Sequence, residues 1–122
     1  MTRANLNFVW QKKGEAPRTL FHYHNGDQYP TGIRDNFNVL ELVSGELTPK
    51  RFKEWIKKNY EGEEPEDLGK GGQPKIYYTD GFITDYSYVF DANLNTIIVW
   101  NWTDKIFEGT PKKFIEWIKK QK

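Results

Sequence analysis

The sequence predicts an α+β domain whose antiparallel β-sheet combines an N-terminal hairpin with a C-terminal meander and carries about three helices on one face. Two observations lead to this fold class. Apolar side chains recur with the two-residue period of strands near both ends of the chain, and two segments place Phe, Trp and Ile at helical spacing. The resulting order, ββ, αα, β-meander, α, is typical of an antiparallel sheet covered by helices on one side.

Length and composition limit the chain to one domain and exclude several classes of protein. With 122 residues it is long enough for one core, so 1–122 is expected to fold as a single unit. A net charge of +1 provides no overall attraction to nucleic acid or membranes. The absence of cysteine excludes disulfides, thiolate metal sites and a cysteine nucleophile. No apolar run approaches the roughly 20 residues of a membrane span, and 1–12 lacks the apolar segment of a signal peptide, so a cytoplasmic location is expected.

Local patterns predict the N-terminal elements. Apolar and polar residues alternate over 5–11 and 18–24, and the turn composition of 12–17 joins these two runs into a β-hairpin. The next segment, 25–32, is dense in turn residues and is expected to be a loop. A helix is expected over 35–45, with Asp35 as the N-cap and Gly45 just beyond the last turn. A strand over 39–43 is the alternative.

Two later segments, 48–58 and 110–120, carry the same helix signal, with nine of eleven aligned residues identical. Each begins with Thr, a good N-cap, followed by Pro, which suits the first helical position because its missing N–H costs nothing there. Phe, Trp and Ile fall on one stripe of each helix, so both stripes are interpreted as core packing, with an exposed stripe that binds a partner as the alternative. The similarity ends outside these windows, so a duplicated domain is not predicted.

The second half of the chain begins with a polar loop and continues as a meander. Five acidic residues within 61–67, followed by a Gly-rich run, predict a flexible loop at 61–75. Alternating and β-branched residues then predict a series of strands. The predicted strands cover 76–79, 83–91, 96–102 and, at the sheet edge, 106–108.

Three segments resemble one group of proteins. Residues 21–32 are similar to the strand-turn pattern Y-x-H-x-D-G-Y-P-x-G of small uncharacterised accessory proteins of phages and prophages. Residues 85–91 resemble their E-Y-x-Y-x-I-D strand, and 106–118 resemble their I-F-E-G-T-P-x-x-F-I-x-W-I ending. The chain differs from the first pattern at two points: residues 27–28 are inserted, and Asn25 replaces an aspartate. The resemblance implies a phage-type accessory protein that acts against host defence, by binding a defence protein or by sequestering a nucleotide signal.

His22 and His24 are two residues apart in a predicted strand, so both side chains are expected on one face of the sheet. Together with Asp27 they offer the ligand types of a metal site. The related pattern places its histidine at the position of Tyr23 and therefore does not support such a site. We expect the two histidines to pack or hydrogen-bond, with no metal and no cofactor bound; metal binding is the alternative.

Candidate binding residues come from two features. The run at 69–72, Gly-Lys-Gly-Gly, offers backbone N–H groups and a lysine to a phosphate, although the spacing is not that of a P-loop and a plain linker is the alternative. Aromatic residues of the meander, beside basic residues such as Arg18, Arg34 or Lys70, offer a surface that could stack a base and hold a phosphate, or that could be buried in an oligomer. The residues chosen for a ligand-binding site are Arg18, Tyr29, Arg34, Lys70, Tyr86 and Trp102.

The expected function is non-enzymatic binding by a homo-oligomer. The first hypothesis is a phage-type counter-defence protein that sequesters a small nucleotide or phosphorylated signal. An alternative is an inhibitor that binds a host defence protein through the acidic loop at 61–67 or the aromatic sheet face. A small hydrolase is the second alternative, but Ser44 and Ser87 lack the G-x-S-x-G context of serine nucleophiles. No membrane or nucleic-acid partner is expected.

Overall fold

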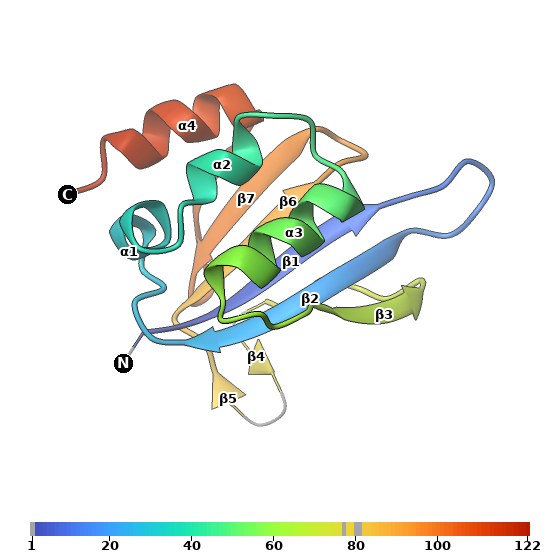
Figure 1. Ribbon diagram of the computed structural model, residues 1–122, viewed down its shortest axis with the longest axis horizontal. Coiled ribbons are helices and arrows are strands. Elements are labelled where there is room, and N and C mark those ends of the chain that lie inside the picture. Colours follow the sequence, from blue (N-terminus) through green and yellow to red (C-terminus); the bar gives the residue numbers. More distant parts are fainter. Residues whose placement is uncertain (1, 77, 80–81) are drawn as a thin grey trace.

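The computed structural model describes residues 2–76, 78–79 and 82–122 (Figure 1). The strands within these residues are β1 (Arg3–Trp10), β2 (Arg18–Asn25), β3 (Glu66–Lys70), β4 (Tyr78–Thr79), β5 (Phe82–Ile83), β6 (Tyr86–Asp91), β7 (Thr96–Asn101) and β8 (Asp104–Gly109). The helices within them are α1 (Pro30–Asp35), α2 (Val39–Val43), α3 (Pro49–Asn59) and α4 (Pro111–Lys119). The predicted α+β class is confirmed.

One sheet of the described residues contains six strands in the order β3-β2-β1-β6-β7-β8, and β4 pairs with β5 in a separate hairpin. All neighbours in the large sheet are antiparallel except β1 and β6, which are parallel at its centre. Parallel neighbours require a long crossover, and here it contains α1 to α3. Figure 1 shows the helices on one side of this sheet, as predicted. The central parallel pair was not predicted.

The N-terminal hairpin follows the predicted alternation. Ala4, Leu6 and Phe8 of β1 face the helices and are fully buried in the core. Asn5 and Asn7 alternate with them and lie on the second face of the sheet, yet they are fully buried as well. Another part of the chain must therefore cover the second face of the sheet at Asn5 and Asn7.

The segment 72–76 provides part of that cover. Asn7 accepts a hydrogen bond from the Lys75 N–H at 2.9 Å and donates one to the Lys75 carbonyl at 3.1 Å. On β2, the Thr19 hydroxyl donates to the carbonyl of Gly72 at 2.8 Å. Polar side chains of the sheet thus hold the segment by its backbone, which explains why polar residues occupy buried strand positions.

The structure departs from the predicted loop at 61–75. Besides the bound segment, the loop region contains β3, an edge strand that pairs with β2. The Asp67 carboxylate accepts the N–H of Gly69 at 2.8 Å, and Gly69 takes a left-handed φ of 82° that favours glycine. Composition alone predicted a loop because the strand that pairs with this acidic, Gly-rich segment is distant in the sequence.

The C-terminal meander is shorter than predicted at its start. The predicted strand 83–91 is divided into β5 and β6 because the chain turns at Asp85. Asp85 exchanges two hydrogen bonds with the backbone of Arg3, one from each residue's N–H, at 2.9 and 3.0 Å. Within the strand predicted at 76–79, Tyr77 lies outside the described residues, and β4 covers the last two. The predicted edge strand is confirmed as β8.

Helices α3 and α4 begin as predicted. Thr48 accepts a hydrogen bond from the Arg51 N–H at 3.2 Å, and Thr110 accepts one from the Lys113 N–H at 3.3 Å. Each helix has proline at its first position. Because the two caps satisfy N–H groups that the helix leaves unpaired, both starting points follow from local sequence.

The segment between the hairpin and α3 differs from its prediction. The predicted loop at 25–32 ends in helix α1, which starts at Pro30. Asp35 closes α1 instead of capping the next helix, and Asn38 with a left-handed φ of 51° is the N-cap of α2. Asparagine tolerates that conformation better than most residues, and this allows two short helices to replace one.

Gln28, one of the two inserted residues, lies at the centre of a buried hydrogen-bond network. Its side-chain oxygen accepts from the Tyr60 hydroxyl at 3.1 Å, and its backbone carbonyl accepts from the Tyr88 hydroxyl at 2.8 Å. The Gln28 amide donates to the Gly26 carbonyl at 2.9 Å. The network joins the end of α3, the loop before α1 and β6, and it satisfies two phenols deep in the core.

These two phenols predict a loss of stability at high pH. Burial raises the pKa of both Tyr60 and Tyr88 above the ordinary tyrosine value. The unfolded chain loses both protons near pH 10, whereas the folded chain keeps them. The stabilising contribution is therefore complete below about pH 10 and falls above it by about 1.4 kcal/mol per pH unit for each tyrosine.

Urea unfolding measured from about pH 8 to about pH 11.5 tests this expectation. The free energy of unfolding is expected to be level at first and then to fall steeply, and Tyr60→Phe is expected to remove about half of the slope. A Tyr60→Phe protein with the slope of the wild type would contradict it.

Candidate functional site

A pocket of about 530 Å³ opens where α1, α4 and strands β6 to β8 meet. Aromatic and aliphatic side chains form part of its wall, and residues with hydroxyl, amide and ammonium groups form the rest. The lining residues that matter here are Tyr29, Tyr86, Ile106 and Trp117 on the apolar side, and Asn101, Gln121 and Lys122 on the polar side. No acidic side chain is among the described residues that line it. The pocket therefore combines flat apolar surfaces with donors and one cation.

Tyr29 enters the pocket from the turn before α1. Its hydroxyl lies 3.4 Å from the Asp27 carboxylate, and 37% of the residue is exposed. Gly32, the third residue of the helix, makes room for this arrangement. A Cβ at Gly32 would lie 2.0 Å from the Asp27 carbonyl oxygen and 3.2 Å from the Tyr29 ring. The Tyr-Pro-x-Gly sequence thus fixes the ring at the entrance of the pocket.

Tyr86 and Asn101 lie opposite each other at one end of the β6 and β7 pair. The Tyr86 ring is half-buried and stacks near Tyr88, with ring centres 6.3 Å apart. Burial raises the pKa of Tyr86, and the nearby charge of Asp85 raises it further. The phenol therefore stays neutral at physiological pH and presents both a ring face and a hydroxyl.

Trp117 of α4 forms a third aromatic wall. The ring is half-buried and packs against Phe107 of β8, with ring centres 5.1 Å apart, and against Phe114, at 5.9 Å. Its backbone carbonyl accepts a hydrogen bond from the Gln121 amide at 3.2 Å. Sequence reasoning missed this residue as a site candidate because it belongs to a regular apolar stripe that reads as core.

Arg34 lies beside the pocket, but its guanidinium already forms hydrogen bonds and an ion pair within the protein. It donates to the carbonyls of Ile118 and Gln121 at 2.9 and 2.8 Å, at the C-terminal end of α4. The Asp35 carboxylate pairs with it at 2.7 Å, and this hydrogen bond lowers the pKa of Asp35. Arg34 therefore holds in place the C-terminal end of α4, which lines the pocket. Any effect of Arg34 on a ligand would come through the position of that segment.

The remaining predicted residues are not brought into this pocket. Arg18 and Lys70 lie at the opposite edge of the sheet, where they pair with Asp67 at 3.5 Å and Glu15 at 3.2 Å. Trp102 follows Asn101 directly but does not line the pocket, and 54% of it is exposed at the turn before β8. Of the six predicted binding residues, Tyr29 and Tyr86 share the pocket and Arg34 adjoins it.

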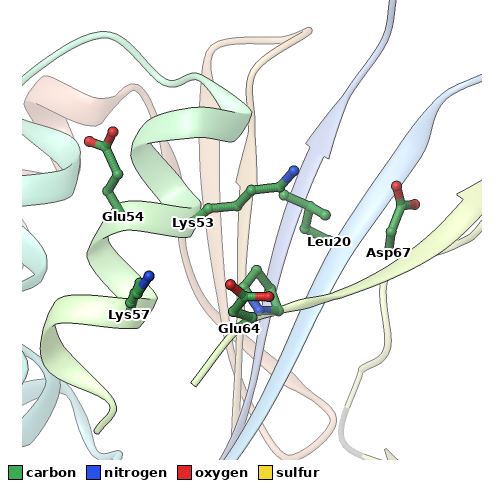
Figure 2. Close-up of a pocket in the computed structure, with 7 residues that line it drawn as sticks. Leu20, Lys53, Glu54, Lys57, Glu64 and Asp67 are labelled. Atoms are coloured by element: carbon green, nitrogen blue, oxygen red, sulfur yellow. The ribbon is translucent and has the colours of Figure 1, made fainter. Parts of the chain in front are cut away.

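A second hollow, of about 310 Å³, lies between α3 and the edge formed by β2 and β3 (Figure 2). Lys53 and Lys57 project from α3, and Leu20 forms the floor on β2. Three carboxylates, those of Glu54, Glu64 and Asp67, outnumber the two lysines in its lining. This balance disfavours a phosphate ligand, so the first pocket is the better candidate for an anionic nucleotide.

The second face of the sheet also has an apolar groove, of about 580 Å³, beside the segment 72–76. Val89, Ile98 and Trp100 line it from β6 and β7, and the ammonium of Lys105 lies 5.6 Å above the Trp100 ring. The exposed aromatic face predicted from the meander is therefore limited. Tyr86 and Tyr88 turn toward the helices, and Trp100 is the meander tryptophan that lines the second face.

His22 and His24 face the same side of β2, as predicted, with ring centres 6.3 Å apart. Glu63, which follows α3, contributes a carboxylate to this cluster, whereas the predicted Asp27 does not. Burial lowers the pKa of His22, the charge of Glu63 opposes this effect, and His24 adds to it. The cluster shares no residue with the aromatic pocket.

Comparisons of the chain with protein-family models, curated proteins and solved structures give no match. The resemblance to phage accessory proteins therefore remains a prediction. Among the described residues, no helix has the length and apolar character needed to cross a bilayer.

Proposed function

We propose that the chain is a non-catalytic binding protein that takes up a small planar, polar ligand of the nucleotide class in the pocket between α1, α4 and β6 to β8. The observation that carries this proposal is the meeting of three aromatic side chains, Tyr29, Tyr86 and Trp117, around one opening. They come from three separate parts of the fold. Aromatic rings of this kind can stack on any nucleotide base, because every base has a flat π-face.

The other lining groups suit the rest of such a ligand. Asn101 and Gln121 carry amides that donate and accept hydrogen bonds, which is what the edge of a base requires. Lys122 offers an ammonium to a phosphate, and no Asp or Glu side chain is among the described residues that line the pocket. Arg18 and Lys70, paired at the far edge, have no part in this site.

Sequestration is the use we propose for the pocket. The described lining carries no histidine, aspartate or glutamate side chain, the groups that most often transfer protons in catalysis, and this favours binding over catalysis. The resemblance to phage accessory proteins supports a role in which the ligand is a host defence signal and the protein removes it from solution.

Titration of the purified chain with cyclic mononucleotides and cyclic dinucleotides, followed by tryptophan fluorescence, tests the proposal. Trp117 is expected to report binding, and Trp117→Phe is expected to remove most of the signal. Tyr29→Ala is expected to weaken binding about fivefold or more, because stacking on one ring contributes about 1–3 kcal/mol. The control Arg18→Ala, at the opposite edge, is expected to bind as the wild type does.

Native mass spectrometry after incubation with the same nucleotides provides an independent readout. An added mass of one nucleotide per chain supports the proposal. The proposal would be overturned if millimolar nucleotide caused no fluorescence quenching and added no mass. Equal affinity in the Tyr29→Ala and Arg18→Ala proteins would also overturn it.

A further inference from the structure

A cluster of metal-ligating side chains lies apart from the aromatic pocket, where the end of α3 passes over the end of β2 (Figure 1). It consists of His22, His24 and Glu63. One ligand atom from each residue, two imidazole nitrogens and a carboxylate oxygen, lies within 4.8 Å of the other two. These residues come together from positions about 40 apart in the chain, so the fold and not the sequence spacing creates the cluster.

The two histidines follow from strand geometry, and Glu63 follows from the way α3 ends. Glu61 and Gly62 take left-handed φ values of 55° and 78°, which reverse the chain after the helix. Two backbone hydrogen bonds hold this reversal, from Gly62 to the Lys57 carbonyl and from Glu63 to the Tyr60 carbonyl, both at 3.0 Å. The turn returns the Glu63 side chain to β2.

Aromatic rings fix the orientation of both imidazoles. The Tyr60 ring packs edge-on against His22 and His24, with centre distances of 5.1 and 4.9 Å. Phe37 packs edge-on against His24 at 5.2 Å and stacks on Tyr60 at 4.6 Å. Such walls reduce the rotational freedom that the ligands would lose on binding a metal.

A second observation points to a ligand for this cluster. The Nε2 atom of His22 is shielded from solvent and has no hydrogen-bond partner among the described residues. The whole residue is 5% exposed. A buried ring nitrogen left without a partner is costly, and the great majority of such atoms are paired. The atom belongs to the same ring that faces His24 and Glu63.

We propose that His22, His24 and Glu63 bind one divalent first-row transition-metal ion of the zinc type. Two imidazole nitrogens and one carboxylate oxygen are a donor set that zinc accepts with a fourth position left to water. Calcium and magnesium prefer oxygen ligands throughout, which this set does not supply. Packing and hydrogen bonding, the role expected from the sequence, would leave the His22 nitrogen unpaired.

The distances define how the ion would be bound. Zinc bonds of about 2.0–2.2 Å require ligand atoms about 3.4 Å apart in a tetrahedral arrangement. The histidines are held by packing, whereas Glu63 is exposed and free to approach. Binding therefore draws Glu63 inward and ties the end of α3 to β2, so the ion acts as a clip between two elements of the core.

Zinc titration of the untagged, full-length chain tests the proposal, after removal of metal with EDTA and in competition with a chromogenic chelator. One zinc per chain is expected. Glu63→Gln is expected to weaken binding at least about tenfold, because it replaces a carboxylate ligand on the surface without touching the core. The matched control is Glu64→Gln, the adjacent exposed carboxylate, which is expected to bind zinc as the wild type does.

Two further measurements keep the test decisive. Cobalt added in place of zinc is expected to give the visible absorption of a tetrahedral site in the wild type and to lose it in His24→Gln. Zinc is also expected to raise the unfolding temperature of the wild type and of Glu64→Gln but not that of Glu63→Gln. Equal zinc affinity in the two glutamate variants, or less than one bound zinc per chain at saturation, would overturn the proposal.

Discussion

Trp55→Ala is expected to lower the free energy of unfolding by about 3–5 kcal/mol, the range for removing a large aromatic side chain from a core. Trp55 is 2% exposed, and its ring packs edge-on against Tyr60 at 5.5 Å and Phe90 at 6.1 Å. The indole N–H donates to the carbonyls of Phe37 and Asn38 at 2.8 and 3.2 Å. Alanine removes the rings' contacts and leaves both carbonyls without this donor, so the cavity and hydrogen-bond costs add.

The chain contains its own matched control for this substitution. Trp117 occupies the same place in the repeated segment, but it is half-buried at the rim of the aromatic pocket. Trp117→Ala is expected to lower the free energy of unfolding by about 1–2 kcal/mol, because it removes roughly half as much buried apolar surface as Trp55→Ala does. Urea unfolding of both variants measures the difference, with midpoints and slopes compared. Equal losses would show that the two helices are packed alike and would contradict the structure.

Asn7→Ala is expected to lower the free energy of unfolding by about 2–4 kcal/mol. Among the described residues, the fully buried side chain makes three hydrogen bonds: two with the Lys75 backbone, at 2.9 and 3.1 Å, and one to the Tyr88 carbonyl, at 3.2 Å. Alanine leaves the N–H and the carbonyl of Lys75 without these partners. The segment 72–76 is then expected to separate from the second face of the sheet.

Hydrogen exchange locates this effect. The Lys75 amide is expected to exchange much faster in Asn7→Ala than in the wild type, while amides of β7 change only by the loss of global stability. Asn59→Ala is a suitable control, because the hydrogen bond that this side chain makes within the described part of the chain is a local one, to the Trp55 carbonyl at 3.0 Å. It is expected to cost less than about 1 kcal/mol. Unchanged exchange at Lys75 would contradict the role assigned to Asn7.

Local patterns account for the parts of the fold that were predicted correctly. The hairpin of β1 and β2, the caps of α3 and α4 and the edge position of β8 depend on neighbours a few residues away. The parallel pairing of β1 with β6 and the strand β3 depend on partners far along the chain. Nothing in an acidic, Gly-rich segment indicates which edge will accept it.

The candidate sites divide in the same way. Aromatic excess and turn chemistry indicated Tyr29 and Tyr86 as ligand-binding residues. In the structure both line the same pocket. Arg18 was grouped with them for its charge and Lys70 for the Gly-rich run around it, and the strand order places both at the other edge of the sheet. Glu63 was missed as a partner of the histidines because only the turn after α3 brings it there.

The repeated segment shows how far the sequence by itself reaches. Its threonine, proline and apolar spacing determined that 48–58 and 110–120 would both be helices with one apolar stripe, since caps and helical periodicity act within a few residues. Only the tertiary structure decided that Trp55 lies in the core and Trp117 at a pocket. Nearly identical local sequences receive different burial because burial depends on what packs against them: α3 lies over the centre of the sheet, and α4 over its β8 edge.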